Sequence, residues 1–231
     1  MQNLENFCAL ICAYNEERTI SDIVKRTQAQ VRDVFVLDDG SKDYTAREAI
    51  RAGAIVLTHK TNMGKGQALK TGFSHLALEK YTGVVTLDAD GQHLPEEIPR
   101  FLAQLDQGYD AVIGKRNFNA EGIPLIRKLS NKWYINMLTR INRQPVYDPE
   151  CGYRAFKTEI LPLLVDSSDI QGFSYESTVL IKLLKAKVKL GWADVSTIYI
   201  PGRVSKIKPL KHAADSIRVC WRCWLDRKSM S

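Results

Sequence analysis

Short apolar runs that alternate with helical patterns constrain the fold of this chain more than any other feature. Between the runs, apolar residues recur every three or four positions, as at Ile20, Ile23 and Val24. Two helices are expected to begin at Asn15-Glu16-Glu17 and, with a side-chain cap, at Ser41-Lys42-Asp43. Strands that alternate with helices predict one α/β domain with a mostly parallel sheet, for which 231 residues suffice. The predicted strands are 7–13, 34–37, 54–57, 83–87 and 111–113.

Polar residues follow the first, second and fourth of these predicted strands. Tyr14-Asn15-Glu16 follows the first, Asp38-Asp39 ends the second, and Asp88-Ala89-Asp90 follows the fourth. In parallel α/β sheets, ligands bind outside the carboxyl ends of the strands. We therefore expect the three clusters to share one site, although polar turns after strands are common without any function.

The aspartate pair after the fourth predicted strand has the chemistry of a metal site. Asp88 and Asp90 are separated by one residue, so their carboxylates repel each other unless a cation lies between them. Gln92 can add a neutral oxygen ligand, and oxygen ligands of this kind suit a divalent cation. The alternative is a polar turn rich in Asp and Gly.

The chain is basic, with 33 Lys and Arg against 26 Asp and Glu and a net charge of +7. This charge predicts an anionic partner such as a phosphate or an acidic membrane surface. The basic residues concentrate in 116–143 and 182–228, away from the aspartates. Nucleic acid is a poor candidate, because aromatic residues are not interleaved with the basic ones and the predicted site is acidic.

Two basic segments carry apolar residues at helical spacing. Each is either a helix packed on the domain with a solvated basic face, or an element that binds a membrane surface. Trp221 and Trp224 among arginines suit the boundary between lipid headgroups and tails. The first apolar stripe is Ile126, Leu129, Trp133, Met137 and Ile141, opposite Arg127, Lys128, Lys132 and Arg140. The second is Leu210, Ala214, Ile217, Trp221 and Trp224.

Cysteine usage and hydropathy predict a protein of a reducing compartment. The five cysteines are odd in number, and Cys8 and Cys12 lie inside the first apolar run. Cys220 and Cys223 form a C-x-x-C pattern without a second Cys or His pair nearby, which disfavours zinc. The longest apolar run, Phe7 to Tyr14, is far shorter than the ~18 residues that span a bilayer. We therefore expect no spanning helix. We also expect no secretory signal, because Glu5 precedes the run and no basic n-region or small-residue cleavage site accompanies it.

Six motifs follow one another along the chain: 13–17 (AYNEE), 38–41 (DDGS), 62–66 (NMGKG), 88–93 (DADGQH), 148–156 (DPECGYRAF) and 201–207 (PGRVSKI). In this order they resemble the signature of family 2 glycosyltransferases, and the nearest subgroup is similar to dolichyl- or polyprenyl-phosphate mannose synthases. The resemblance covers about residues 7–210, and its specificity lies in the order and spacing of the motifs. One departure is Cys12-Ala13, where the family often has a proline before its Tyr-Asn-Glu.

The resemblance implies a single GT-A domain over residues 1–231, with helices flanking the sheet. Residues 1–115 would bind the nucleotide-sugar, 116–208 would bind the acceptor, and 209–231 would form a C-terminal basic amphipathic helix. The implied activity is inverting, metal-dependent transfer from a GDP- or UDP-sugar to a polyprenyl phosphate or other lipid-linked acceptor. The enzyme would be cytoplasmic and peripherally bound to the inner face of the cell membrane.

Three other functions stay open at this point. The acceptor could instead be a sugar hydroxyl of a glycan or glycolipid. Nucleotidyl transfer uses a related fold, but the expected Gly-rich loop after the first strand is replaced by Tyr14-Asn15-Glu16. The chain could also be a non-catalytic protein that binds nucleotide-sugars or docks at membranes. The sequence does not identify the base, the sugar or the oligomeric state.

The resemblance also implies roles for individual residues. Asp148 would be a general base only for a hydroxyl acceptor, because a phosphate is already an oxyanion. The alternatives are structural: an Arg154–Asp148 ion pair, a solvated Glu176, and a basic surface loop that carries Arg203 and Lys206. The implied catalytic residues are Asp148, Arg154 and Arg203, and the implied acceptor-binding residues are Arg116 and Glu176. Nucleotide-sugar binding falls to Ala13, Tyr14, Glu16, Asp38, Asp39, Lys65, Asp88, Ala89 and Lys206, and Mg²⁺ or Mn²⁺ binding to Asp88, Asp90 and Gln92.

Overall fold

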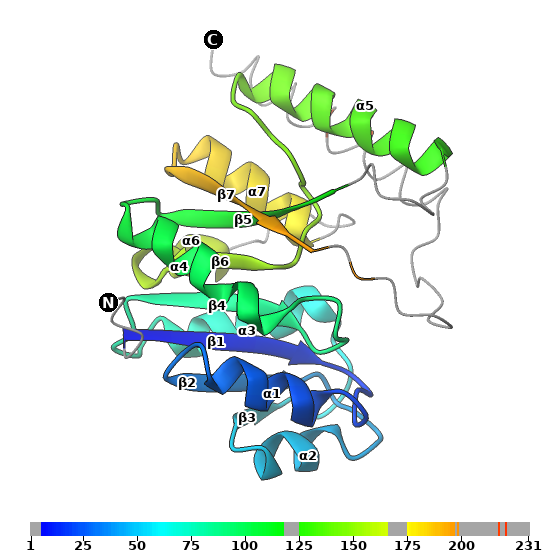
Figure 1. The fold of residues 1–231 in the computed structure, drawn as a ribbon, viewed down its shortest axis with the longest axis vertical. Helices are drawn as coiled ribbons and strands as arrows, with labels where there is room; N and C mark the ends of the chain where they lie inside the picture. The colour runs from blue at the N-terminus through cyan, green and yellow to red at the C-terminus, as the bar shows by residue number, and fades with distance from the viewer. Residues whose placement is uncertain are drawn as a thin grey trace.

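The computed structural model describes residues 6–117, 125–165, 175–196, 198, 217 and 220, which form a seven-stranded sheet with helices on both faces (Figure 1). The strand order is β3-β2-β1-β4-β6-β5-β7. This architecture confirms the predicted α/β fold with a mostly parallel sheet. The strands are β1 Phe7–Ala13, β2 Asp33–Asp38, β3 Ile55–Thr58, β4 Gly83–Asp88, β5 Ala111–Arg116, β6 Arg154–Lys157 and β7 Leu190–Val195.

One short strand interrupts the parallel sheet. β6 lies between β4 and β5 and runs antiparallel to both, whereas the other pairs are parallel. β1 lies near the centre and is apolar along its length because both of its faces are covered. Leu10 packs into the cluster on one face, and Ile11 packs into the cluster on the other.

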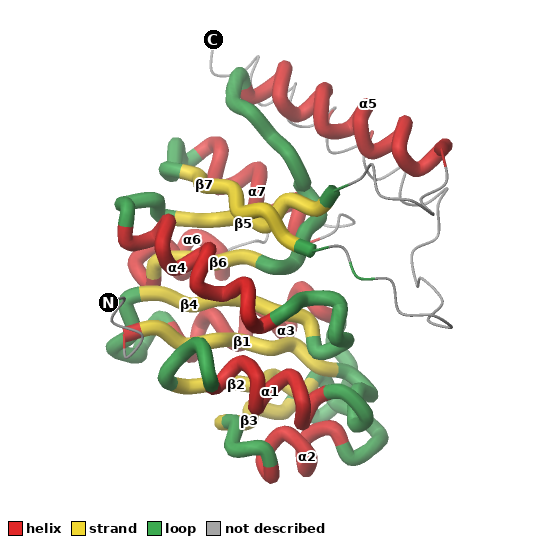
Figure 2. Tube along the Cα trace, in the orientation of Figure 1, coloured by secondary structure: helices red, strands yellow, loops and turns green. Residues whose placement is uncertain are grey.

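Helices cover the two faces of the sheet in separate groups (Figure 2). On one face lie α1 Ile20–Gln28, α2 Thr45–Arg51 and α4 Ile98–Asp106, which follows a 3-10 turn at Pro95–Glu97. On the other face lie α3 Lys65–Leu76 and α6 Leu161–Val165, which follows a 3-10 turn at Thr158–Ile160. Two further helices are α5 Leu125–Asn142 and α7 Tyr175–Lys185, and α7 contacts both α3 and α6.

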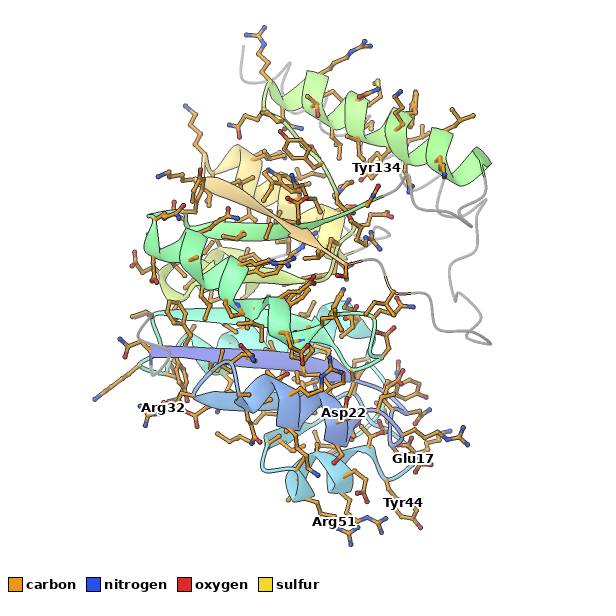
Figure 3. The ribbon with its side chains drawn as sticks, viewed as in Figure 1. Glu17, Asp22, Arg32, Tyr44, Arg51 and Tyr134 are labelled. Carbon is orange, nitrogen blue, oxygen red and sulfur yellow. The ribbon has the colours of Figure 1, made fainter. Side chains whose placement is uncertain are left out.

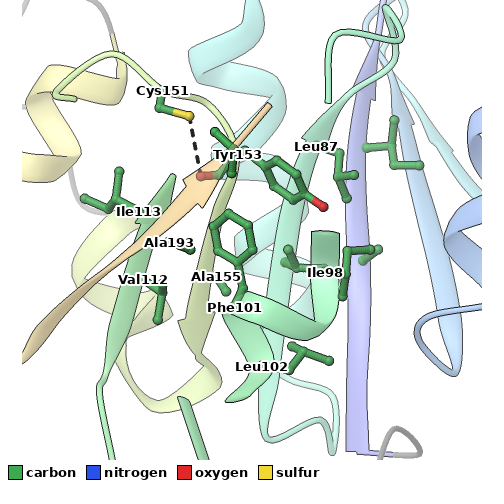
Figure 4. Packing of buried hydrophobic residues seen from close by; sticks show 14 of the residues in the cluster. Leu87, Ile98, Phe101, Leu102, Val112, Ile113, Cys151, Tyr153, Ala155 and Ala193 are labelled. Carbon is green, nitrogen blue, oxygen red and sulfur yellow. Dashed lines mark hydrogen bonds between the residues drawn. The ribbon is translucent and has the colours of Figure 1, made fainter. Parts of the chain in front are cut away.

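An aromatic stack fixes the segment that leads into β6 (Figure 4). The ring of Tyr153 lies between Phe101 of α4, with centroids 4.4 Å apart, and His93, with centroids 4.9 Å apart. The Tyr153 hydroxyl donates to the Leu94 carbonyl at 2.8 Å. Tyr153 is fully buried, so this packing ties the 148–156 motif to the segment after β4.

Two helices begin later than the sequence predicts. Asn15 has a φ of 55°, in the left-handed region that Asn tolerates, and α1 begins only at Ile20. Ser41 does not cap α2, because its hydroxyl donates to the Asp38 carboxylate. Asp43 instead accepts a hydrogen bond from the Thr45 backbone N–H at 3.0 Å, and α2 begins there.

The predicted apolar stripe of α5 does not form a single buried face. Tyr134 and Leu138 are buried together with Ile141, whereas Leu129 is 59% exposed and Trp133 is 46% exposed. The buried side of α5 therefore includes Ile141 of the predicted stripe, with Met137 partly buried, but excludes Leu129 and Trp133. Figure 3 shows Tyr134 on this helix, and its hydroxyl lies 3.0 Å from the Ser177 hydroxyl of α7.

Most of the predicted C-terminal helix lies outside the described residues. Within it only Ile217 and Cys220 are described, and both are helical. Across the described parts of the chain, no helix combines the length and the apolar character that crossing a bilayer requires. Cys8, Cys12, Cys151 and Cys220 are free thiols.

Candidate active site at the carboxyl edge of the sheet

The strand register brings the predicted donor residues together. At the carboxyl end of β1, Cys12 is paired with Asp88 of β4, and Ala13 is paired with Asp38 of β2. The segments that follow these three strands therefore begin side by side. Tyr14, the next residue of the first segment, is half-buried at this edge.

Hydrogen bonds between the first and second segments fix their shape. The Asn15 N–H donates to the Ser41 hydroxyl at 2.9 Å, and that hydroxyl donates in turn to Asp38. The Glu16 N–H donates to the Thr45 hydroxyl at 2.8 Å. Asp38 is 3% exposed, so these contacts hold a buried carboxylate at the edge where the resemblance places the nucleoside.

Asp39 binds the turn before α3 rather than facing open solvent. Its carboxylate accepts hydrogen bonds from the Met63 N–H at 2.9 Å and the Gly64 N–H at 2.7 Å. It also lies 2.7 Å from Nδ1 of His59, a residue that the sequence did not single out. These contacts give Asp39 a structural role, because they set where α3 and its first residue, Lys65, begin.

Ala89 contributes through its backbone. Its side chain is 1% exposed, and its carbonyl accepts a hydrogen bond from the Thr19 hydroxyl at 2.7 Å. This bond ties the segment after β4 to the turn before α1. The backbone of Ala13 acts similarly, since its carbonyl accepts from the Asp39 N–H at 2.9 Å.

Lys65 forms two ion pairs at the centre of the site. Its Nζ lies 2.6 Å from Oδ1 of Asp88 and 2.9 Å from Oε1 of Glu176, the second residue of α7. Burial opposes the charge of Lys65, but attraction to Asp88 and Glu176 outweighs it and raises the Lys65 pKa. Burial likewise opposes the charge of Asp88, but the Lys65 ammonium lowers the Asp88 pKa to about 2. All three groups are therefore charged at neutral pH.

His93 forms a hydrogen bond with the backbone of Asp88. Nδ1 of His93 accepts a hydrogen bond from the Asp88 N–H at 3.1 Å, which requires an unprotonated Nδ1. Burial lowers the pKa of His93, although the Asp88 carboxylate opposes this effect. The neutral ring, stacked on Tyr153, therefore acts as a fixed acceptor for the turn that carries Asp88 and Asp90.

Asp90 and Gln92 lie on the turn after β4, where a metal would need further ligands. Asp90 is half-buried and its Oδ1 accepts from the Gln92 N–H at 3.0 Å, while Gln92 is exposed. Among the described residues, no three His, Cys, Asp or Glu side chains are grouped so as to hold a metal ion. Mg²⁺ is typically bound by one or two carboxylates together with substrate phosphates. The oxygen ligands here fit such an incomplete site, which a diphosphate would complete.

The buried Asp148 carboxylate forms a bidentate ion pair with the half-buried Arg116. Nε of Arg116 donates to Oδ2 at 2.7 Å, and Nη2 donates to Oδ1 at 2.9 Å. The Arg116 N–H and the Glu150 N–H donate to the same carboxylate at 3.2 Å and 3.3 Å. Asp148 is 1% exposed. Four donors therefore occupy the carboxylate, which leaves it poorly placed to take a proton from a hydroxyl.

Arg154 does not pair with Asp148 in the way the structural alternative supposed. Its guanidinium donates to the carbonyls of Cys151 at 2.7 Å, Glu176 at 2.8 Å and Pro149 at 2.9 Å. Because Arg154 is only 3% exposed, these bonds give it a structural role that joins the 149–151 turn to α7. Its predicted catalytic role stays a prediction.

Three further site predictions have different outcomes. The side chain of Glu176 is only 14% exposed, so the alternative of a solvated helix glutamate is wrong. Arg203 and Lys206 lie outside the described residues, and their roles stay predictions. No local sequence signal pointed to the Lys65–Glu176 contact, because it joins residues far apart in the chain.

Comparison with known proteins identifies the class of protein to which this α/β fold belongs. The model of glycosyl transferase family 2 matches residues 8–162. The chain therefore belongs to glycosyl transferase family 2, and it is a glycosyltransferase.

Proteins of similar sequence come from archaea and bacteria. An uncharacterized protein of Methanocaldococcus jannaschii is 30% identical over 210 residues, which is 88% of this chain and 86% of that protein. Undecaprenyl-phosphate 4-deoxy-4-formamido-L-arabinose transferase of Klebsiella pneumoniae is 30% identical over 176 residues. That alignment covers 71% of this chain and 52% of the transferase, so the chain spans about half of that relative's length.

Solved structures confirm the GT-A fold. Glucosyl-3-phosphoglycerate synthase from Mycobacterium tuberculosis, crystallised with Mn²⁺, UDP and phosphoglyceric acid, has a TM-score of 0.70 and 20% identity. The match covers 95% of this chain and 78% of that one. At this identity the likeness shows the fold alone.

Proposed function

We propose that this glycosyltransferase moves a sugar, with inversion, from a UDP- or GDP-sugar to a lipid phosphate at the cytoplasmic surface of a membrane. The observation that carries the proposal is the meeting of Asp38, Lys65, Asp88 and the Asp90 turn at one sheet edge. Residues 1–115 would form the donor half and 116–208 the acceptor half of one domain.

The donor half supplies a buried acidic edge for the nucleoside and a charged turn for the diphosphate. Asp90, with Gln92 or Asp88, would hold Mg²⁺ or Mn²⁺, whose charge offsets that of the leaving diphosphate. The Glu16 carboxylate and Tyr14 would line the nucleoside side together with Asp38. Arg203 and Lys206 would add positive charge to the phosphates.

The state of Asp148 supports a phosphate acceptor over a sugar hydroxyl. A hydroxyl needs a general base, and the Asp148 carboxylate already accepts from Arg116 and Glu150. A phosphate is ionised and needs none. The name of the Klebsiella relative, an undecaprenyl-phosphate transferase, supports the same acceptor class.

The exposed side of α5 supports membrane association. Leu129 and Trp133 are 59% and 46% exposed, and Lys132 beside them is exposed. Apolar side chains next to lysines favour a headgroup boundary, and each basic residue near an anionic surface contributes about 1 kcal/mol. The basic residues of 209–231 would add to this attraction.

A transfer assay with paired acceptors tests the proposal. The purified chain is incubated with radiolabelled UDP- and GDP-sugars, Mn²⁺ or a chelator, and either polyprenyl phosphate or the matching polyprenol. We expect labelled lipid only with the phosphate and only with the metal. Equal transfer to polyprenol would contradict the phosphate acceptor, and transfer under saturating chelator would contradict the metal requirement.

A further inference from the structure

Lys65 joins two carboxylates from parts of the chain that are distant in sequence. Asp88 ends β4, whereas Glu176 lies at the start of α7, and the Lys65 ammonium lies within 2.9 Å of both. The side chains of Asp88 and Glu176 are 28% and 14% exposed, so solvent screens this cluster less than it would a surface pair.

Gly152 has no side chain, and this absence makes room for the ion cluster. A Cβ added to Gly152 would lie 2.7 Å from Nζ of Lys65 and 3.2 Å from Oδ2 of Asp88. Gly152 belongs to the motif that leads into β6, and its carbonyl accepts from the Thr86 hydroxyl at 2.9 Å. The backbone at Gly152 therefore closes over the Lys65–Asp88 pair, and Lys65 has little freedom to move away.

The charges of the cluster set its attraction for cations. Asp88 and Glu176 together exceed the charge of Lys65 by one negative unit, and Asp90 on the next turn adds a second. A dication would match this excess. Without the Lys65 ammonium, the three carboxylates would attract cations far more strongly. Without the Glu176 carboxylate, the remaining Asp88, Asp90 and Lys65 would attract cations less strongly.

We propose that Lys65 is a built-in counter-ion of the aspartate pair, and that Glu176 positions Lys65 instead of contacting the acceptor. This inference rests on the proposed metal-dependent function, and it replaces the acceptor-binding role that the family resemblance implied for Glu176. Lys65 holds Asp88 in place and competes with a dication for it. Glu176 draws part of the ammonium's charge away from Asp88 and restores negative charge to the site. Together they set how tightly the free enzyme binds its metal.

A Mn²⁺ titration tests the proposed effect on metal affinity without turnover. The electron paramagnetic resonance signal of free Mn²⁺ monitors the titration. The full chain is titrated alone and with saturating UDP or GDP. Because the two substitutions change the site's charge in opposite directions, we expect K65M to bind Mn²⁺ about 10-fold more tightly and E176Q about 10-fold more weakly. The double variant K65M/E176Q should return close to the wild-type value.

A distant ion pair supplies the matched control. Lys157 lies 2.9 Å from Asp110 with a comparable exposure, but its strand position pairs with Gly83, at the opposite end of β4 from Asp88. K157M removes one positive charge from the protein and should leave the Mn²⁺ affinity unchanged. A shift equal to that of K65M would show that net charge alone is responsible, and the inference would be overturned.

Two other results would also overturn the inference. One is unchanged Mn²⁺ affinity in both K65M and E176Q. The other is an E176Q enzyme with a raised KM for polyprenyl phosphate but unaltered metal binding, as expected if Glu176 contacts the acceptor. If K65M does not fold, E176Q decides, because it keeps the Lys65–Asp88 pair. Failure of the wild type to bind Mn²⁺ even with UDP or GDP would instead refute the proposed function.

Discussion

The guanidinium of Arg116 donates two hydrogen bonds to the carboxylate of Asp148, of 2.7 Å and 2.9 Å. Arg116 is the last residue of β5, and Asp148 opens the motif that leads into β6. The pair therefore anchors the 148–156 motif to the end of a core strand. Its fork geometry is one that lysine cannot reproduce.

Removing the guanidinium should destabilise the protein. R116M leaves the buried Asp148 carboxylate without its ionic partner, and we expect the free energy of unfolding to fall by about 3 kcal/mol. Urea unfolding followed by circular dichroism measures this. K115M, on the same strand, breaks a pair with Asp194, which is 82% exposed, and should cost less than about 1 kcal/mol. Similar losses in the two variants would contradict the structural role of Arg116.

The Asp90 carboxylate should be needed for transfer but not for folding. D90N keeps the size of the side chain and removes its charge, so we expect kcat/KM to fall about 100-fold or more. Steady-state transfer and thermal unfolding are measured together. D106N changes an exposed aspartate at the end of α4 and should alter neither. Full activity of D90N would be incompatible with a metal held at this turn.

Neutral His93 should make the fold sensitive to acid. Burial lowers its pKa in the folded protein, so below the ordinary value of about 6.5 the unfolded chain binds a proton that the folded protein does not. The contribution of His93 is therefore fully present above that pH and falls below it, by up to about 1.4 kcal/mol per pH unit.

Unfolding free energies measured between pH 7.5 and pH 5.5 test the role of His93. In H93N the amide oxygen can still accept from the Asp88 N–H, so we expect the variant to fold and its pH slope to be smaller than that of the wild type. H75Q, which replaces a half-buried histidine of α3, controls for loss of an imidazole. An undiminished slope in H93N would refute the prediction.

Gly40 should be irreplaceable in the turn after β2. Its φ is 69°, and an added Cβ would lie 2.5 Å from the carbonyl carbon of Thr61, a backbone atom that cannot move aside cheaply. Strain and overpacking together predict that G40A loses about 2–4 kcal/mol. Gly108 has a φ of 88° but meets only the flexible end of Lys189 at 3.7 Å, so G108A should lose about 1 kcal/mol. Urea unfolding measures both losses of stability. Equal losses in G40A and G108A would contradict the predicted clash at Gly40.

Membrane binding should depend on the exposed side of α5. Replacing Trp133 by Ser or Leu129 by Gln removes apolar area, and each should weaken binding to anionic vesicles about 10-fold. Sedimentation with phosphatidylglycerol vesicles at low salt measures it. Leu78, 88% exposed after α3, supplies the control L78Q. If the wild type does not sediment at all, membrane association is rejected.

The sequence predicted well that the segments after β1, β2 and β4 meet at one sheet edge, because the first half of the sheet is built from local patterns. Each early strand is a continuous apolar run, and the residue after its last position must lie at the carboxyl edge. The second half is different. β6, Arg154–Lys157, is four residues long with only two apolar ones, and its position is set by pairing with β4 and β5. No local pattern could have predicted it.

For the candidate site, too, the sequence predicted the positions within motifs but not the contacts between distant segments. Motifs located Asp88 and Lys65, but their ion pair with Glu176 depends on where α7 packs. The structural partner proposed for Asp148 was Arg154, from its position in the same motif, whereas the observed partner, Arg116, lies on β5. The buried side of α5 departs from the predicted stripe at Tyr134, which is buried in place of Trp133 and whose hydroxyl lies 3.0 Å from that of Ser177.

The antiparallel β6 has a consequence for how this protein is made. β4 and β5 do not pair with each other, so the sheet stays in two pieces until the chain has been synthesised past Lys157. β1 to β4 pair among themselves without β6, and the segment immediately before β6 carries Asp148 and Gly152. The strand pairing that joins the two parts of the sheet therefore also sets Gly152 against the Lys65–Asp88 pair.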